Sequence, residues 1–276
     1  MRILRIILMI LCAGLGQAAT ATGPRPFELG IVPYLPTTTL VTAYQPLRAH
    51  LEEKLQRPVV LTTAPDFITF LERCLRKEYD AIVLGPGLGR FLQTEAGYLP
   101  VVVTRRNIKA LVIVERHAPY TGLKDLSGKR VALLDPMLAL SQLGKEIFRL
   151  NGLQPERDLQ FHVVKSPSNA VHAVLQGEVD AGVTTANLIP QLEDDLRLRL
   201  RILAESREIP GLMFMLLPGG SNRVRQVQDI LLQFENSVAG QQFFEVLALE
   251  GLRVPGEREL KAMDGFQSDI RKRLKP

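Results

Sequence analysis

The stretch GKRVALLDPMLALSQLGKEIFRLN, residues 128–151, decides the fold because it predicts a strand that leads directly into a helix. Residues 130–134 form a short apolar run typical of a strand. Asp135-Pro136 then favours a helix start, since aspartate can cap free amide groups and proline suits the first helical position. Asn151-Gly152 tolerates a left-handed C-cap and should end the helix. Because ligands of open α/β sheets bind where strands lead into helix N-termini, this junction is the expected ligand cradle of the second half of the chain.

Alternating strands and helices are predicted on both sides of this stretch, which favours mostly parallel sheets flanked by helices. The loop after the first strand should include residues 33–39, and the next helix should hold Pro46 in its first turn, where proline is tolerated. The buried face of that helix carries apolar residues at helical spacing: Tyr44, Leu47, Leu51 and Leu55. The other strands are expected at residues 27–32, 59–63, 81–84 and 99–104, and from about Leu159, Ala181 and Arg201.

A short internal repeat suggests two lobes of similar topology. Residues 77–83, KEYDAIV, and residues 177–183, GEVDAGV, should each end a helix and open a strand at an Asp-Ala pair. We expect a first lobe from residues 22–107, a second lobe from residues 108–207, and a return to the first lobe with C-terminal helices in residues 208–276. The two crossings, residues 105–109 and 205–211, would form a hinge that closes the lobes over a ligand.

The N-terminus has the composition of a cleavable signal peptide over residues 1–21. Basic residues precede an apolar run at residues 6–13, and the small residues that follow offer cleavage after Ala18 or Ala21. A retained anchor is the alternative. No later run approaches the roughly 18 to 20 apolar residues of a membrane span, so a secreted, periplasmic protein is expected.

The composition excludes several function classes. Removal of Arg2 and Arg5 lowers the formal charge from +5 to +3, which does not call for nucleic acid. Cys74 would be the single cysteine left after cleavage, so neither a disulfide framework nor a cysteine zinc site is expected. The four histidines are scattered, no G-x-S-x-G motif occurs, and Arg90 stands where a dinucleotide fingerprint needs its third glycine. No catalytic residues, metal or cofactor are therefore expected.

Several short motifs occur in the order and spacing of a known family. They are PYLP with YQPL (33–36 and 44–47), APDF (64–67), YDA with GP (79–81 and 85–86), LKDLSGKRVA (123–132), DP (135–136), GEVD (177–180) and IPG (209–211). With these, the chain resembles the periplasmic phosphate, phosphite and phosphonate binding proteins (PhnD-like) of ABC transporters. The resemblance covers nearly all of the mature sequence. It implies a type II, Venus-flytrap fold with a small molecule between two lobes and a membrane permease as partner.

The residues that hold the anion in phosphonate-binding members differ in this chain. Leu138-Ala139-Leu140 stands where the family has a Ser/Thr triplet, with Ser141 as the nearest hydroxyl. Phe67 replaces a tyrosine, and Pro167 replaces a histidine. A dianion in a closed cleft needs several hydrogen-bond donors, which leucine cannot supply. The ligand is therefore expected to be neutral, zwitterionic or partly apolar.

The expected cleft lining combines hydroxyl, amide and aromatic side chains. These are Tyr34, Thr38, Phe67, Ser141, Ser168, Asn169, Thr184, Thr185 and Asn187, although each Ser or Thr could equally be a turn or capping hydroxyl. The sequence thus predicts a monomeric periplasmic solute-binding protein of an ABC importer. The alternative is a sensory or partner-regulating envelope module of the same fold.

Overall fold

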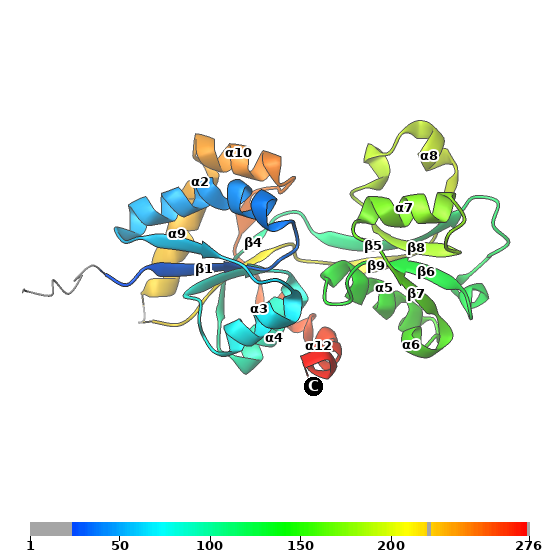
Figure 1. Ribbon diagram of the computed structural model, residues 1–276, viewed down its shortest axis with the longest axis horizontal. Helices are drawn as coiled ribbons and strands as arrows, with labels where there is room; N and C mark the ends of the chain where they lie inside the picture. The colour runs from blue at the N-terminus through cyan, green and yellow to red at the C-terminus, as the bar shows by residue number, and fades with distance from the viewer. Residues whose placement is uncertain (1–23, 220–221, 275–276) are drawn as a thin grey trace, which may run out of the picture.

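The computed structural model describes residues 24–219 and 222–274, which form two lobes, each built around one sheet (Figure 1). The sheet of lobe 1 has the strand order β11-β4-β10-β3-β1-β2, and that of lobe 2 has the order β7-β6-β8-β5-β9. The strands of lobe 1 are β1 (Phe27–Ile31), β2 (Val59–Thr62), β3 (Ala81–Leu84), β4 (Leu99–Thr104), β10 (Met213–Leu216) and β11 (Leu252–Arg253). Those of lobe 2 are β5 (Ile108–Glu115), β6 (Arg130–Leu133), β7 (Gln160–Val163), β8 (Ala181–Thr185) and β9 (Leu200–Ile209).

Both sheets are mixed rather than mostly parallel. Strand β1 pairs in parallel with β2 and β3, and β6 pairs in parallel with β7 and β8. The strands that follow or precede the crossings, β5, β9 and β10, pair antiparallel with their neighbours. The expectation of parallel pairing therefore holds for the β-α-β part of each lobe. It fails for the crossing strands because a chain that leaves a lobe and returns to it enters the sheet from the opposite direction.

Helices cover both faces of each sheet. In lobe 1, one face carries α2 (Thr37–Leu55), α9 (Arg223–Glu235) and α10 (Val238–Val246), and the other carries α3 (Phe67–Leu75), α4 (Pro86–Glu95), α11 (Glu257–Lys261) and α12 (Gln267–Leu274) (Figure 1). In lobe 2, α5 (Ala139–Leu150) and α6 (Pro155–Asp158) lie on one side, and α7 (Pro167–Leu175) and α8 (Asp194–Leu198) on the other. Short 3-10 turns are η1 (Leu123–Leu126), η2 (Ile189–Gln191) and η3 (Asp264–Phe266).

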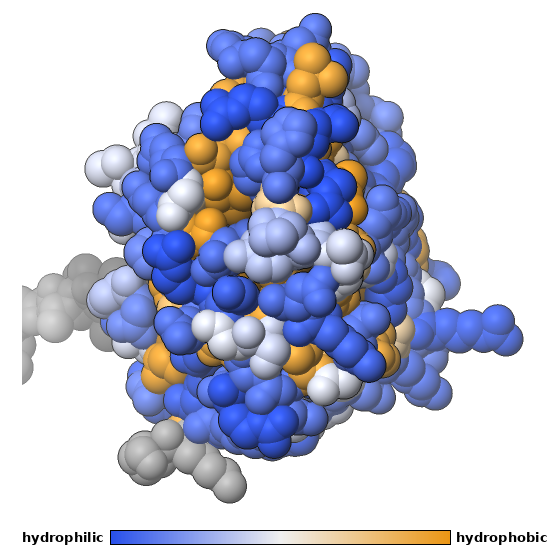
Figure 2. All heavy atoms as spheres, turned by 90° about the vertical axis from the view of Figure 1, so that its right-hand side faces the viewer, coloured by the Kyte–Doolittle hydropathy of each residue, from blue (hydrophilic) through white to orange (hydrophobic). Residues whose placement is uncertain are grey.

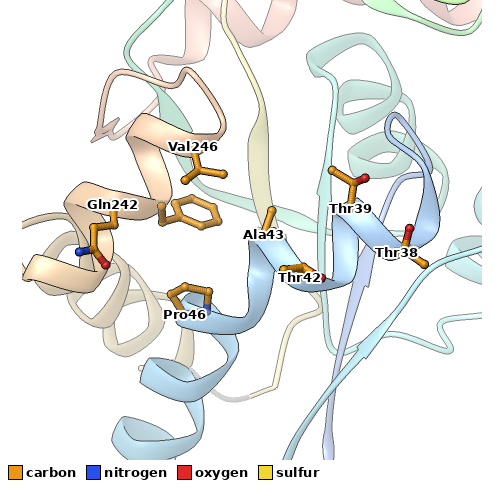
Figure 3. Close-up of a pocket in the computed structure, with 8 residues that line it drawn as sticks. Thr38, Thr39, Thr42, Ala43, Pro46, Gln242 and Val246 are labelled. Carbon is orange, nitrogen blue, oxygen red and sulfur yellow. The ribbon is translucent and has the colours of Figure 1, made fainter.

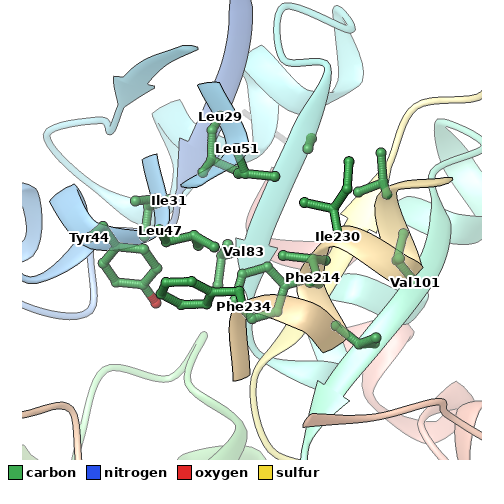
Figure 4. Close-up of a cluster of buried hydrophobic side chains, with 14 of the residues drawn as sticks. Leu29, Ile31, Tyr44, Leu47, Leu51, Val83, Val101, Phe214, Ile230 and Phe234 are labelled. Carbon is green, nitrogen blue, oxygen red and sulfur yellow. The ribbon is translucent and has the colours of Figure 1, made fainter. Parts of the chain in front are cut away.

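The side chains of each strand alternate between the two faces of its sheet, so the core has one hydrophobic cluster on each sheet face. Leu29 and Ile31 of β1 pack under α2, α9 and α10, as Figure 4 shows for this cluster, whereas Ile82 and Leu84 of β3 pack on the opposite face. In lobe 2, Val112 faces α5 and Ile113 faces α7. Successive strand side chains point to opposite faces, so strands covered on both sides read as continuous apolar runs.

The two repeated motifs occupy equivalent positions in the two lobes. Lys77 (φ 59°) and Gly177 (φ 72°) both have left-handed backbone and end α3 and α7. The Asp80 carboxylate accepts the N–H of Glu28 at 3.0 Å, and the Asp180 carboxylate accepts the N–H of Arg130 at 3.0 Å. Each aspartate thus accepts an N–H at the start of the neighbouring parallel strand, from the second residue of β1 and the first residue of β6. The domain boundaries expected from the sequence stay a prediction.

Two helix starts differ from the expectation. Helix α2 begins at Thr37, so Pro46 lies inside the helix rather than in its first turn. Pro46 leaves the carbonyl of Thr42 without its intrahelical donor, but Thr42 is exposed and water can reach it. Helix α5 begins at Ala139, three residues after the Asp-Pro pair, because the Asp135 carboxylate accepts the N–H of Met137 at 2.8 Å and forms a tight turn instead of a cap.

The C-terminal elements contact both lobes. Helix α12 packs on α4 of lobe 1. On the lobe 2 side, Arg149 of α5 pairs with Asp269 of α12 at 2.6 Å, and Arg207 of β9 donates to the carbonyl of Ala262 at 2.9 Å and lies over the ring of Phe266. The lobes are therefore joined by these contacts of the C-terminal elements as well as by the two chain crossings.

The outer end of lobe 2 is mostly hydrophilic, with smaller groups of hydrophobic residues between the hydrophilic ones (Figure 2). Within residues 24–219 and 222–274, no helix combines the length and apolar character that a membrane span requires.

Candidate ligand-binding site

The carboxyl ends of the parallel strands lie on the sides of the two lobes that face each other. The loop after β1 and the first turn of α2 form this side of lobe 1, and the loops after β6 and β8 form it in lobe 2 (Figure 1). The strand-to-helix junctions thus meet between the lobes, as expected for an open α/β sheet.

The first turn of α5 is apolar and packed. Met137 is 3% exposed and belongs to the hydrophobic cluster of lobe 1, although its chain segment belongs to lobe 2. Ala139 and Leu140 are buried. The hydroxyl of Ser141 is also buried and donates to the carbonyl of Leu134 at 2.9 Å. The side chains of this turn therefore offer no free hydroxyl to a ligand.

Helices α4 and α5 bring their first turns together between the lobes. A Cβ placed on Gly85, the N-cap of α4, would lie 3.9 Å from the Cβ of Ala139, and one on Gly87 would meet the Oε1 of Gln142. Gln142 is 2% exposed, and neither its Oε1 nor its Nε2 has a hydrogen-bond partner among the described residues. A side chain at position 87 would therefore require the Gln142 side chain to move, and its Cβ would lie 3.2 Å from the ring of Phe266.

The expected lining residues of lobe 1 lie at the ends of its strands and at helix starts. The hydroxyl of Tyr34 lies 3.0 Å from that of Tyr44, and burial raises the pKa of both phenols, so both are protonated at neutral pH. Phe67 is the first residue of α3 and packs partly on the core. Thr38 is exposed in the first turn of α2.

The expected lining residues of lobe 2 divide into structural and accessible ones. Thr184 is fully buried and donates to the carbonyl of Pro167 at 3.2 Å, so, like Ser141, its hydroxyl has a structural partner. Ser168 is half-buried and Asn169 exposed, both in the first turn of α7. Thr185 is half-buried at the end of β8, and Asn187 is exposed just after it.

Three of these residues line three separate cavities. Thr38 lines a groove between α2 and α10, Asn169 lines a hollow beside β7 and α7, and Asn187 lines a cavity at the hinge. Figure 3 shows Thr38, Thr39 and Thr42 along α2, opposite Gln242 and Val246 of α10. The groove belongs to lobe 1 alone.

The hinge cavity is lined by both lobes and the crossing segment, and its volume is about 430 Å³. Arg106 pairs with Glu250 at 2.6 Å, and the amide of Asn107 donates to Glu208 at 3.1 Å. Lys109 pairs with Glu205, and this hydrogen bond raises the pKa of the lysine, which stays charged. The residues that line the hinge cavity are Arg105, Arg106, Asn107, Lys109, Ala186, Asn187, Pro190, Gln191, Glu208 and Glu250.

The sequence predicted residues 105–109 and 205–211 as the hinge but did not predict that their charged side chains line a cavity. Residues 105–109 read RRNIK, and this cluster of cations within a predicted hinge was the available signal. Their acidic partner Glu208 lies in the other predicted crossing, whereas Glu250 carries no local signal because it comes from a distant segment. Within the described part of the chain, no group of three or more His, Cys, Asp or Glu side chains is arranged to hold a metal ion.

The sequence matches a family model described as "ABC transporter, phosphonate, periplasmic substrate-binding protein" over residues 29–259. The chain belongs to this family. Its members are solute-binding proteins of ABC importers and not enzymes, which confirms the expected fold and function class. No curated protein matches the sequence.

Solved structures with low sequence identity share the fold. XAC2383 from Xanthomonas citri, bound to ATP, has a TM-score of 0.77 at 18% identity, over 90% of this chain and 99% of that one. PhnD1 from Prochlorococcus marinus, in complex with methylphosphonate, has a TM-score of 0.74 at 12% identity, over 91% and 100%. The aliphatic sulphonate binding protein SsuA from Escherichia coli has a TM-score of 0.58 at 16% identity, over 91% and 89%. The fold is thus the type II periplasmic-binding-protein fold.

Proposed function

We propose that this member of the family carries a zwitterionic or neutral small molecule, rather than a phosphonate dianion, to the permease of an ABC importer. The apolar, packed first turn of α5 is the observation that carries this proposal. Met137, two residues before the helix, is buried in the hydrophobic cluster of lobe 1, and in the turn itself Ser141 donates to Leu134. An anion placed there would lack side-chain donors, and an unpaired buried charge is costly.

The turn also carries a negative charge of its own. The Asp135 carboxylate accepts the N–H of Met137, so it takes up a backbone donor close to the start of α5. A carboxylate beside a helix N-terminus already satisfies the positive end of the helix dipole. This arrangement disfavours a second anion at the same place.

The hinge cavity supports a ligand with both donors and acceptors. Its walls carry the guanidinium of Arg106, the ammonium of Lys109 and the carboxylates of Glu208 and Glu250. A volume of about 430 Å³ falls within the range of small-molecule sites. We place the ligand between the lobes against this cavity, with Asn187 as the contact from the loop after β8. Tyr34, Thr38, Phe67, Ser168, Asn169 and Thr185 are accessible parts of the predicted lining, and Ser141 and Thr184 position the loops around it.

The remaining features of the proposal are cellular. The signal peptide predicted at residues 1–21 lies outside the described residues. It would export the protein, and the mature chain would act in the periplasm. It acts as a monomer whose lobes close by rotation at residues 105–109 and 205–211. A sensory partner in place of the permease is the alternative use of the same closure.

A dye-based thermal-shift screen of the mature protein tests the ligand class. Its panel contains methylphosphonate and phosphate beside amino acids, polyamines, pyrimidines and short carboxylates. A ligand at 100 times its dissociation constant stabilises the native state by about 2.7 kcal/mol, which gives a clear shift. We expect a shift from a zwitterion or neutral solute and none from methylphosphonate.

Paired variants locate the response. Asn187→Ala should weaken binding of the compound that gives the shift, whereas Gln176→Ala, an exposed residue in the hollow beside α7 and outside the predicted lining, serves as the matched control. A methylphosphonate shift that disappears in Ser141→Ala would contradict the proposal, because it would show that the first turn of α5 opens and binds an oxyanion.

A further inference from the structure

A second polar cavity lies at the end of lobe 1 that points away from lobe 2, where β1 begins (Figure 1). Its volume is about 520 Å³, and its walls include Phe27, Leu55, Arg57, Asn222, Arg223 and Gln226. These residues come from β1, the end of α2, the segment before β2, and the start of α9. The cavity is separate from the space between the lobes.

Beside this cavity three guanidinium groups converge on one carboxylate, and two of them, those of Arg57 and Arg223, line the cavity. Arg223, Arg57 and Arg25 lie 2.9, 3.2 and 3.6 Å from the Asp80 carboxylate, which is 10% exposed. No other carboxylate pairs with these arginines among the described residues, and the remaining residues of the chain contain no aspartate or glutamate. Two positive charges are therefore in excess.

The arginines are held in place on an aromatic ring. The guanidinium carbons of Arg57 and Arg223 lie 5.1 and 5.6 Å from the centroid of the Phe27 ring. The Nε of Arg57 is buried and has no hydrogen-bond partner within the described chain. Stacked guanidiniums lose little entropy when they bind an oxyanion, because their planes are already oriented.

The equivalent position in lobe 2 shows that the fold does not need this excess. Asp180 caps the N–H of Arg130 as Asp80 caps that of Glu28. It is satisfied by one guanidinium, that of Arg130 at 3.3 Å, and by the hydroxyl of Tyr120 at 2.8 Å. One arginine thus suffices for an aspartate in this position, and lobe 1 has two more than this, of which Arg57 also donates to the carbonyl of Pro26 at 3.3 Å.

The start of α9 adds to the positive potential of the cavity. This helix has 13 residues, its N-cap Asn222 makes no side-chain capping bond, and its first turn contains no acidic residue. Arg223 and Arg225 occupy that turn instead. Cations at a helix N-terminus are unfavourable unless an anion compensates them.

We propose that the cavity lined by Arg57 and Arg223, with Arg25 beside them on Asp80, is a second binding site, which takes the phosphate group of a ligand. Planar guanidiniums bind phosphate oxygens with paired hydrogen bonds. The cavity is much larger than a phosphate ion, so the group belongs to a larger molecule, either a soluble phosphate ester or a lipid headgroup. This site does not depend on what binds between the lobes.

Isothermal titration of the full mature protein with inorganic pyrophosphate at low ionic strength is the direct test. We expect saturable binding that Arg57→Gln and Arg223→Gln each weaken about tenfold or more, as for hydrogen bonds to charged groups. Sedimentation with phosphatidylglycerol vesicles, against phosphatidylcholine vesicles, distinguishes the source of the phosphate. Binding to either probe that requires these arginines supports the site.

Matched variants keep the test decisive. Arg130→Gln removes the arginine on Asp180 in lobe 2 and should leave binding unchanged. Arg25→Gln alters a side chain that is 69% exposed, so the fold should not depend on it, and binding should still weaken. The site would be refuted if neither probe bound, or if the three lobe 1 substitutions had no more effect than Arg130→Gln.

Discussion

Helices α2 and α5 occupy equivalent places in the two lobes, since each connects the first two parallel strands of its sheet, yet their first turns differ in chemistry. Thr37, Thr38 and Thr39 begin α2 and are exposed. Leu138, the N-cap of α5, is followed by buried Ala139 and Leu140 of the lobe 2 core, and Met137 just before it packs in the cluster of lobe 1. The hydroxyl-bearing helix start is thus in lobe 1, whereas that of lobe 2 contributes to packing between the lobes. Equivalent backbone positions therefore do not imply equivalent ligand contacts.

The aspartates of the repeat should show the largest difference between the lobes. Asp80→Ala leaves three arginines without their carboxylate and the N–H of Glu28 without its acceptor, which should cost about 3 kcal/mol of unfolding free energy. Asp180→Ala removes fewer partners and should cost about 1.5 kcal/mol. Urea denaturation followed by circular dichroism measures both. Equal losses would mean that the extra arginines of lobe 1 do not interact with Asp80 in solution.

Acid should weaken the same contacts in both lobes. Burial alone would raise the pKa of Asp80, but hydrogen bonds from Arg223 and Glu28 hold it below its ordinary value. Asp180 likewise has a lowered pKa: burial opposes the shift, and hydrogen bonds from Arg130 and Tyr120 produce it. A carboxyl whose pKa is lowered by folding stabilises the protein above its ordinary pKa of about 3.9, and this contribution is lost as the pH falls through the folded-state pKa.

The destabilisation by Asp80→Ala should therefore stay nearly constant from pH 6 to about pH 4 and shrink as the pH falls further to pH 3. Denaturation curves of the wild type and the variant across this range measure it. A difference that stayed constant down to pH 3 would exclude the carboxylate charge as its source.

A packing difference between the sheets gives the next effect. Gly30 of β1 faces Tyr79, and a Cβ there would lie 2.7 Å from the tyrosine ring. The equivalent residue of β6 is Ala132, which shares its cluster with the smaller Val179. Gly30→Ala should thus cost about 2 kcal/mol by overpacking.

A double-mutant cycle separates overpacking from other causes. In a Tyr79→Leu background the cost of Gly30→Ala should largely disappear, because the ring that meets the new methyl group is absent. If the cost were the same in both backgrounds, the Tyr79 ring would not be the reason for glycine at position 30.

Helix caps should give the smallest difference. Asp66 accepts the N–H of Thr69 at 2.8 Å at the start of α3, and Ser166 accepts that of Asn169 at 3.1 Å at the start of α7. Replacement of either by alanine should cost about 1 kcal/mol. The loss at Asp66 should be slightly larger, because its carboxylate also interacts with the helix dipole. Thermal denaturation of the Asp66→Ala and Ser166→Ala variants measures this difference, with Thr39→Ala at an exposed position as the control. A larger loss for Ser166→Ala than for Asp66→Ala would show that the helix dipole contributes little.

The sequence by itself determined the strands and helices, the two-lobe plan and the family. Apolar runs such as residues 81–84 and the repeat around Asp80 and Asp180 record burial and turn geometry within a few residues, and local patterns are sufficient for these. The sequence correctly placed the Asp135-Pro136 pair close to a helix start, but it predicted Asp135 as the helix cap, whereas Asp135 forms a turn with Met137 before the helix. A cap and such a turn have the same local sequence pattern.

Only the tertiary structure decided which distant residues meet. The antiparallel direction of β5, β9 and β10 follows from the two crossings between lobes, and the burial of Met137 follows from the docking of α5 against lobe 1. Asp80 pairs with Arg25, Arg57 and Arg223, and Arg223 lies 143 positions away in the sequence. At the hinge cavity, Arg106 pairs with Glu250, which lies 144 positions away. Such contacts depend on long-range strand pairing and helix docking, and no periodicity within a short window records them.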